Sequence, residues 1–378
     1  MEQNMKNAFR FAIETGNIEL FDVLAKDFNS FTQEDKDYLI EATVLWAPNT
    51  DFIQHVLDYG YDINHKDEDG WTLLHLAAIS DFPENARFFI NKGIDKEIKD
   101  KYGMTPLIIA AQYGDSVEVL KTLIELGCDE KVCDDDGENL LICAAGRNPN
   151  PEITKYLIER GHDIEARDKE GFTPLLNAAM WQSNSDVIDI LIDAGADIDA
   201  KTKKGDSLFH HAAYNESCEV VHYISSGFLP SQTNNDGITC FEVALCNAKT
   251  AEVMKVFLRE MKQEHLFLAA YNENPEILET LILSGYDVNT QNLDGITLLM
   301  CVAQNNKNPK VISSLMYHRG NINTKDNKGR TILHYAASNK DATIYNWMLE
   351  RDEFKAFIDE KDDKGNVPSY YKEHPEDF

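Results

Sequence analysis

The sequence predicts an all-α repeat solenoid, in which short helices stack side by side along the chain. Two observations predict it. The stretch at residues 171–179, GFTPLLNAA, recurs along the chain. The glycines that open these stretches are Gly70, Gly103, Gly137, Gly171, Gly205, Gly237, Gly295 and Gly329. They follow one another at nearly constant intervals, with one longer gap after Gly237. A second glycine usually lies ten residues before each of them. The period predicts about 11 helix pairs over residues 5–350.

Each unit contains two short amphipathic helices. In the unit that opens at Gly103, the first helix is predicted from Thr105 to Tyr113, because Thr is a favoured N-cap residue and Pro fits the first turn. The second is predicted from Val117 to Leu126, where apolar residues recur at helical spacing and Leu123 belongs to the core. The alanine pair in the first helix lets neighbouring units approach closely.

The segments between helix pairs carry turn signals. A glycine in the left-handed conformation ends each second helix, and an extended finger with a D-x-x-G turn follows it. Aspartate accepts hydrogen bonds from backbone N–H groups in such turns, so many acidic residues have a local role. The expected helix-ending glycines are Gly60, Gly93, Gly127, Gly161, Gly195, Gly227, Gly285 and, at nine residues instead of ten, Gly320.

The pattern D-x-x-G-x-T-P-L-x-x-A-A, followed by a leucine-rich helix and G-A-D-I-N, resembles the ankyrin repeat family. The resemblance implies a single solenoid over residues 1–378, with about 11 stacked helix-turn-helix repeats, β-turn fingers and degenerate terminal caps, the C-terminal one at 351–378. Ala244 and Ala269 lie closer together than the first alanines of other successive inner helices, which leaves no room for a finger between them. An irregular junction is therefore predicted at 246–264, with one helix over 249–261.

The resemblance also implies a concave groove for a partner protein, lined by finger tips and by the residues after each alanine pair. In this register the predicted groove residues are Trp71, Ile79, Tyr102, Met104, Tyr113, Phe172, Met180, Trp181 and Tyr214, with acidic Asp69, Asp135, Asp136, Glu138 and Glu170 between them. Exposed aromatic residues concentrate binding energy, and acidic neighbours favour a basic protein partner. Truncation of Trp71 or Trp181 is expected to weaken binding more than stability.

The composition excludes several classes of function. Lys and Arg number 36 against 65 Asp and Glu, and the net charge of −29 disfavours binding to nucleic acid. No basic start precedes an apolar segment, and no stretch approaches 18 apolar residues, so a cytoplasmic protein without membrane insertion is expected. The protein is also expected to be a monomer. A secretion route that needs no cleavable signal is left open.

No motif predicts catalysis, a cofactor or a metal. The seven cysteines form no C-x-x-C pair, and the runs DEDG (67–70) and DDDG (134–137) lack the alternating acids of a calcium loop. His75, His210 and His334 occupy the place of the histidine in the family's T-P-L-H motif, which implies hydrogen bonds to loop backbone.

Three alternatives to a binding scaffold stay open. One is an acidic decoy or inhibitor of a basic, nucleic-acid-binding enzyme, whose binding would weaken steeply with salt. Another is an enzyme with an unrecognised site near His210, His211 and the groove. The third is a substrate of asparagine hydroxylases, because fingers with D-x-N, as at 62–64 and 287–289, resemble those that are modified.

Overall fold

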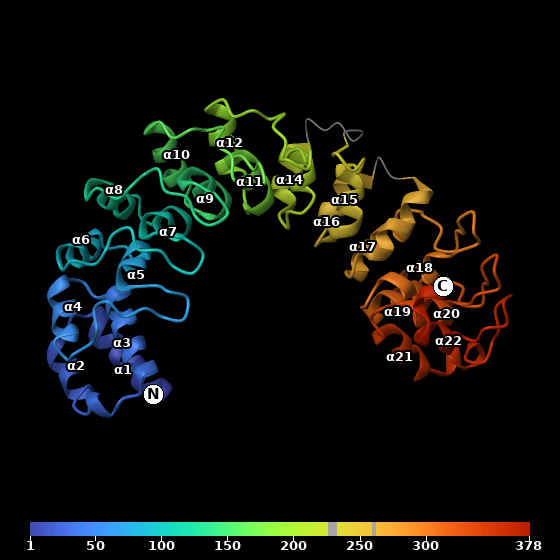
Figure 1. Cartoon of the computed structure of the whole chain (residues 1–378), viewed down its shortest axis with the longest axis horizontal. Coiled ribbons are helices and arrows are strands. Elements are labelled where there is room, and N and C mark those ends of the chain that lie inside the picture. Colours follow the sequence, from blue (N-terminus) through green and yellow to red (C-terminus); the bar gives the residue numbers. More distant parts are fainter. Residues whose placement is uncertain (226–232, 259–261) are drawn as a thin grey trace. The chain divides into compact units, whose positions relative to one another are not determined.

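The computed structural model describes residues 1–225, 233–258 and 262–378, which form two compact units, Met1–Lys203 and Lys204–Phe378 (Figure 1). Short helices make up nearly all regular structure in these residues, and the β-structure consists of three isolated antiparallel bridges. Within the described residues, no helix combines the length and apolar character needed to cross a membrane.

The first unit contains six helix pairs in two layers, which lie on opposite sides of its ribbon in Figure 1. The inner layer, formed by the first helix of each pair, comprises α1 (Gln3–Glu14), α3 (Gln33–Trp46), α5 (Leu73–Ile79), α7 (Pro106–Tyr113), α9 (Leu140–Arg147) and α11 (Pro174–Trp181). The outer layer comprises α2 (Ile18–Leu24), α4 (Thr50–Leu57), α6 (Pro83–Asn91), α8 (Val117–Glu125), α10 (Pro151–Glu159) and α12 (Asp186–Asp193). A short 3-10 helix, η1 (Phe28–Ser30), joins α2 to α3.

The second unit adds five pairs and a terminal helix. Its inner layer is α13 (Leu208–Ala212), α15 (Cys240–Asn247), the 3-10 helix η3 (Gln263–Tyr271), α18 (Leu298–Asn305), α20 (Ile332–Ser338) and α22 (Pro368–Glu373). Its outer layer is α14 (Cys218–Ser225), α16 (Ala251–Phe257), α17 (Pro275–Leu283), α19 (Pro309–Tyr317) and α21 (Thr343–Leu349). The 3-10 helices η4 (Asp352–Phe357) and η5 (Pro375–Asp377) flank α22, which packs on α20 as the terminal cap. The predicted number of eleven pairs is confirmed within the described residues.

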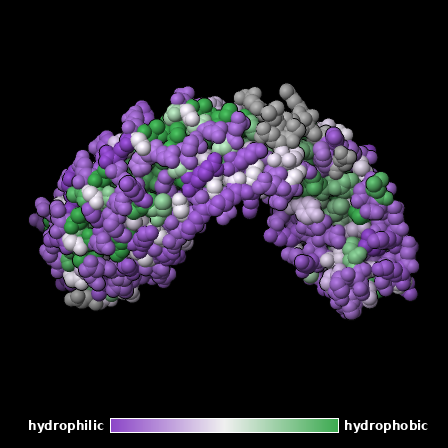
Figure 2. All heavy atoms as spheres, turned by 45° about the horizontal axis from the view of Figure 1, so that its top comes forward, coloured by the Kyte–Doolittle hydropathy of each residue, from purple (hydrophilic) through white to green (hydrophobic). Residues whose placement is uncertain are grey.

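The predicted helix boundaries hold to within one residue in the repeat that opens at Gly103. Helix α7 begins at Pro106, and Thr105 caps it by accepting a hydrogen bond from the Ile108 N–H at 3.4 Å. Leu123, on the outer helix of the same pair, is fully buried between the two layers. On the face shown in Figure 2, hydrophilic residues predominate at the surface of each unit.

The fingers close with turns that a side-chain acceptor organises. Asp100 Oδ1 accepts hydrogen bonds from the N–H groups of Tyr102 (2.8 Å) and Met104 (2.9 Å), and Gly103 supplies the positive φ of 77°. The same two bonds are made by Asp67, Asp134, Asp168, Asn234, Asn292, Asp326 and Asp362. One backbone bond then joins a finger to the preceding one, as from Asp135 N–H to Tyr102 O at 3.0 Å.

A row of side-chain amides, here called the amide ladder, completes the inner helices. Asn148 Nδ2 donates to the carbonyl groups of Ala111 (2.9 Å) and Gly114 (2.8 Å) in the preceding repeat. Carbonyl groups at the end of a helix have no intrahelical partner, so the neighbouring repeat satisfies them. The ladder comprises Asn148 and Gln182 in the first unit and Asn272, Asn306 and Asn339 in the second.

One predicted helix-ending glycine is wrong. The other glycines in that set that are described have positive φ, but near Gly320 the residue with positive φ is Arg319, at 66°. Arg319 lies ten residues before the finger glycine Gly329. The position in the repeat, and not the residue type, therefore decides which residue adopts the left-handed conformation. A left-handed conformation at a residue with a Cβ costs roughly 1–2 kcal/mol.

The region of the predicted irregular junction contains α16, which ends at Phe257, and η3, which begins at Gln263. Of the helix predicted over 249–261, residues 259–261 lie outside the described residues, as does Gly227. The next inner element is a 3-10 helix where an α-helix is expected.

Candidate protein-binding face

Three side chains of the first unit form what we call the inner row: Tyr113, Arg147 and Trp181. They are the last residues of α7, α9 and α11, and they are equally spaced along the chain. Because these helices pack on one another in sequence, the three side chains occupy one position in successive repeats. Tyr113 is 47% exposed and Trp181 is 54% exposed, so two large rings face solvent.

Arg147, whose repeat lies between those of Tyr113 and Trp181, is held by a buried acid. Its Nη1 donates to Glu138 Oε2 at 2.6 Å, and its guanidinium carbon lies 5.8 Å from the centre of the Trp181 ring. Glu138 Oε1 also accepts a hydrogen bond from Asn177 Nδ2 at 3.1 Å. Burial raises the pKa of Glu138, and the nearby Arg147 opposes that shift.

Other predicted groove residues differ in exposure. Tyr102 is 54% exposed, and the Nζ of Lys101 lies 5.0 Å from its ring centre. Tyr214 is 39% exposed and belongs to the second unit. Ile79, Phe172 and Met180 are half-buried.

Trp71 is tied into its own finger. Its Nε1–H donates to Asp100 Oδ2 at 3.1 Å, and its ring stacks on His75 with centres 5.9 Å apart. The ring is half-buried. Trp71 therefore packs between fingers, and its contribution to an exposed face is small.

Two predicted groove residues are buried instead. Met104 is 8% exposed and Glu138 is 6% exposed, so the expectation that they line an open groove is wrong. Both follow a finger glycine, and the turn fixes their backbone: Met104 N–H donates to Asp100 Oδ1, and Met104 O accepts from Asp100 N–H at 3.0 Å. In both cases the side chain after the glycine packs against the inner helices.

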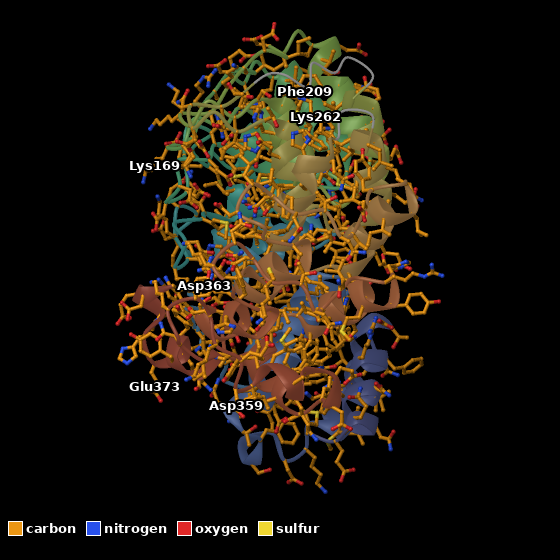
Figure 3. All side chains as sticks on the ribbon, turned by 90° about the vertical axis from the view of Figure 1, so that its right-hand side faces the viewer. Lys169, Phe209, Lys262, Asp359, Asp363 and Glu373 are labelled. Carbon is orange, nitrogen blue, oxygen red and sulfur yellow. The ribbon has the colours of Figure 1, made fainter. Side chains whose placement is uncertain are left out.

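The remaining predicted acidic residues are exposed, but lysines alternate with them along the fingers. Asp69 forms an ion pair with Lys101. Lys169, which projects from the finger edge in Figure 3, donates to the Asp135 carbonyl at 2.5 Å. The finger tips of this unit thus carry Glu68, Asp69, Asp135, Asp136 and Glu170 together with Lys101, Lys169 and Lys203.

A family model of ankyrin repeats in three copies matches residues 39–132, 108–202 and 266–362, which together cover more than half of the chain. The chain belongs to the ankyrin repeat family. Ankyrin repeats imply binding to other proteins, and the family is typically non-enzymatic.

Relatives of this ankyrin repeat protein are similar over short segments. Protein phosphatase 1 regulatory subunit 27 of Mus musculus is 35% identical over 74 residues, which are 19% of this chain and 48% of the relative. Human ankyrin repeat and SOCS box protein 3 is 44% identical over 45 residues, 12% of this chain and 9% of that protein. A Caenorhabditis elegans homolog of transient receptor potential cation channel subfamily A member 1 is 27% identical over 117 residues, 30% and 10% of the two chains. The chain spans about half of the first of these relatives and a tenth or less of the others.

The ankyrin histidines have the predicted backbone contacts. His75 Nδ1 accepts from Thr72 N–H at 3.1 Å, and its Nε2 lies 3.2 Å from Met104 O. His210 and His334 make the equivalent contacts, which confirms their structural use. Burial lowers the pKa of the neighbouring His211 to about 4, and the Cys218 side chain lies outside the described residues.

Two clusters among the described residues have potential metal-ligating atoms, namely Asp134, Glu138 and Cys143 in the first unit and the exposed His374, Glu376 and Asp377 in the second. The donor atoms of Asp134, Glu138 and Cys143 lie within 4.8 Å of one another. Arg147 already compensates the charge of Glu138, and Asp134 Oδ1 accepts two backbone N–H groups of its turn. These contacts explain the first cluster without a metal.

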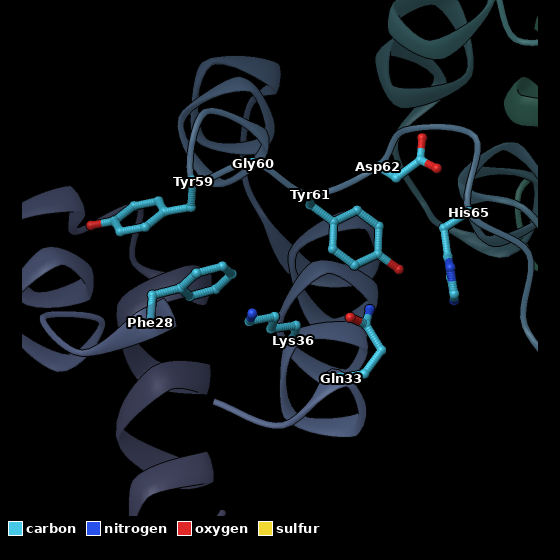
Figure 4. Close-up of a pocket in the computed structure, with 8 residues that line it drawn as sticks. All are labelled: Phe28, Gln33, Lys36, Tyr59, Gly60, Tyr61, Asp62 and His65. Atoms are coloured by element: carbon cyan, nitrogen blue, oxygen red, sulfur yellow. The ribbon is translucent and has the colours of Figure 1, made fainter. Parts of the chain in front are cut away.

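A hollow in the first unit has a volume of about 250 Å³ (Figure 4). It is lined by Phe28, Gln33, Lys36, Tyr59, Gly60, Tyr61, Asp62 and His65. The Tyr59 hydroxyl donates to Asp22 at 2.7 Å and the Tyr61 hydroxyl donates to Asp37 at 2.9 Å, so both phenols already have partners. Ligand pockets usually measure about 300–1,000 Å³, so this hollow is a weaker candidate for a binding site than the inner row.

Sequence reasoning missed Arg147 and the amide ladder. Arg147 lies midway in the sequence between Tyr113 and Trp181, and this register would have identified it as their neighbour. The ladder amides lie directly after the inner helices, at nearly constant sequence intervals within each unit. Arg147 pairs with Glu138 on a finger, and each ladder amide bonds to the preceding repeat, so the local sequence does not reveal these contacts.

Proposed function

We propose that the first unit binds a partner protein on the face that carries the inner row, with Tyr113 and Trp181 as the main contacts. The observation that supports this most is the exposure of two large rings, 47% and 54%, on either side of an arginine that is fixed before binding. Aromatic residues and arginine are the residue types most often responsible for interface energy. Tyr102 extends the same aromatic character onto the neighbouring finger.

We further propose that the partner carries a basic surface. Residues 1–203 contain 40 of the 65 acidic and 19 of the 36 basic residues, a net charge of −21 out of −29. Such a field speeds the approach of a basic protein. The exposed rings, and not the charge, then hold the complex together.

An acidic decoy for a nucleic-acid-binding enzyme is the second candidate, and the net charge favours it. The alternation of lysines with acids at the finger tips counts against it, because a phosphate mimic needs uninterrupted rows of negative charge. Salt separates the two proposals, since a charge-driven complex weakens steeply as ionic strength rises.

The test is site-specific photo-crosslinking. A photoreactive phenylalanine at position 113 or 181 should capture a protein that the same group at position 317 does not capture, because Tyr317 is 83% exposed but belongs to the second unit. Titration of the purified partner should then show that Trp181→Ala and Tyr113→Ala weaken binding at both low and high salt. Unchanged affinity in both variants would contradict the proposed face.

Two separate measurements test the other expectations. The mass of the free protein in light scattering tests the expected monomer. Cell fractionation tests the expected cytoplasmic location.

A further inference from the structure

Glu138 differs from its counterparts in the first unit. The residues that follow the finger glycines of the neighbouring repeats are Met104 and Phe172, and Trp71 follows the glycine one repeat further away. Glu138 is 6% exposed, and Met104 is buried almost equally at 8%. Repeats therefore stack with an uncharged residue at this position, and stacking alone does not require a carboxylate.

The Glu138 carboxylate connects three elements. It lies on a finger, accepts a hydrogen bond from Arg147 at the end of α9 at 2.6 Å, and accepts another from Asn177 on α11 at 3.1 Å. Asn177 approaches closely because residue 146 is glycine: a Cβ there would lie 2.7 Å from Asn177 Cγ. Helix α11 also carries Trp181, so the carboxylate fixes an arginine relative to the helix that bears the exposed ring.

We propose that Glu138 is a positioning residue of the binding face. It holds Arg147 in the interval between Tyr113 and Trp181 and thereby sets the shape and charge of the inner row. This inference rests on the proposed function of that row. A partner gains because the arginine is already ordered, so its side-chain entropy is not lost on binding.

Two variants separate charge from packing. Glu138→Gln keeps the shape and an acceptor for Asn177 but removes the charge, and Glu138→Met supplies the residue that the preceding repeat has. NMR reports on the inner row through two signals. One is the guanidinium signal of Arg147, assigned by comparison with Arg147→Lys. The other is the fluorine signal of Trp181 in protein that contains fluorotryptophan. In both variants we expect faster guanidinium rotation and a shifted Trp181 signal, with less loss of thermal stability than in Leu123→Ala.

A double-mutant cycle tests whether Glu138 acts through Arg147. Glu138→Gln should weaken binding of the purified, crosslinked partner by the same factor as Arg147→Gln, and the double variant by no more than either. Restoration of binding by Glu138→Asp would support a positioning role.

Multiplicative losses in the double variant, or wild-type Arg147 and Trp181 signals in Glu138→Gln, would overturn the inference. The proposed function fails on a different result, namely unchanged partner affinity in Tyr113→Ala and Trp181→Ala. The spectroscopic outcome does not depend on the partner, so the two failures are distinguishable.

Discussion

Trp181 and Trp71 lie on the same unit, yet their side chains make different contacts. Trp181 is 54% exposed, and the guanidinium carbon of Arg147 lies 5.8 Å from the centre of its ring. Trp71 donates to Asp100 at 3.1 Å and stacks on His75. The first ring is available to a partner, and the second holds adjacent fingers together.

The two tryptophans should therefore respond differently to truncation. We expect Trp181→Ala to lower the free energy of unfolding by less than about 1 kcal/mol, and Trp71→Ala by about 2 kcal/mol or more, because a packed ring and a hydrogen bond to a carboxylate are lost. Urea denaturation of both variants measures the difference. Equal destabilisation would mean that Trp181 is also a packing residue.

His211 should titrate far below the usual histidine range. Burial lowers its pKa to about 4, so the folded protein keeps the ring neutral while the unfolded chain binds a proton below about pH 6.5. The unfolded state then holds more protons, and stability falls as pH decreases from 6.5 to 4, by up to about 3 kcal/mol. Histidine NMR measures the pKa, and His211→Gln should reduce the acid sensitivity of unfolding. A His211 pKa near 6.5 would contradict this assignment.

Sequence register predicted the exposed Tyr102, Tyr113 and Trp181 because repeat spacing gives the position of a residue in its unit. It failed for Met104 and Glu138, since the direction of the side chain after a finger glycine depends on the hydrogen bonds of the turn. Repeat spacing therefore gives the position of a residue within its repeat, and the folded turn determines where its side chain points.

At the scale of elements, the fingers depend on glycine for two separate reasons. Gly103 and Gly60 both have positive φ, 77° and 92°. A Cβ at Gly103 would lie 2.9 Å from the backbone nitrogen of Asp135 in the next finger, whereas a Cβ at Gly60 meets nothing within 4 Å. Gly103 is therefore needed for the positive φ and for the close approach of the next finger, whereas Gly60 is needed for the positive φ alone.

This contrast predicts the cost of alanine. Gly60→Ala should destabilise the protein by about 1 kcal/mol, the cost of a left-handed residue with a Cβ, and Gly103→Ala by about 2 kcal/mol or more, because the neighbouring finger must also move. Chemical denaturation of the pair compares them directly. If the two values agree, the contact between fingers adds nothing.

The boundaries of α7 and α8 follow from local signals, which is why they agree with prediction to one residue. Caps and prolines act within a few residues, so the sequence carries them directly. The 3-10 character of η3 and the amide ladder depend on neighbouring repeats. A residue such as Asn148 resembles any loop asparagine until its two acceptors in the preceding repeat are known.

At the scale of the molecule, each repeat packs mainly on its neighbours. Stability in such arrays spreads through nearest-neighbour contacts. The chain forms two compact units, and the expectation of a single solenoid over 1–378 stays a prediction.

Damage should therefore remain local. Leu123→Ala, which opens a cavity in the first unit and should cost about 2–5 kcal/mol, is expected to speed amide hydrogen exchange in the adjacent repeats and to leave residues 262–378 unchanged. Exchange followed by mass spectrometry gives the pattern. Uniformly faster exchange would show one cooperative unit.

The amide ladder also gives the chain a direction of completion during synthesis. The carbonyl groups that end α7 receive hydrogen bonds from Asn148, which the ribosome adds only after α8, the following finger and the whole of α9. The repeats that carry Asn148, Asn272 and Asn306 each complete the inner helix of the preceding repeat and are completed in turn by the amide of the next one. In a nascent chain that pauses between two such repeats, the last inner helix lacks the hydrogen bonds to its terminal carbonyl groups. The next repeat to emerge supplies these hydrogen bonds.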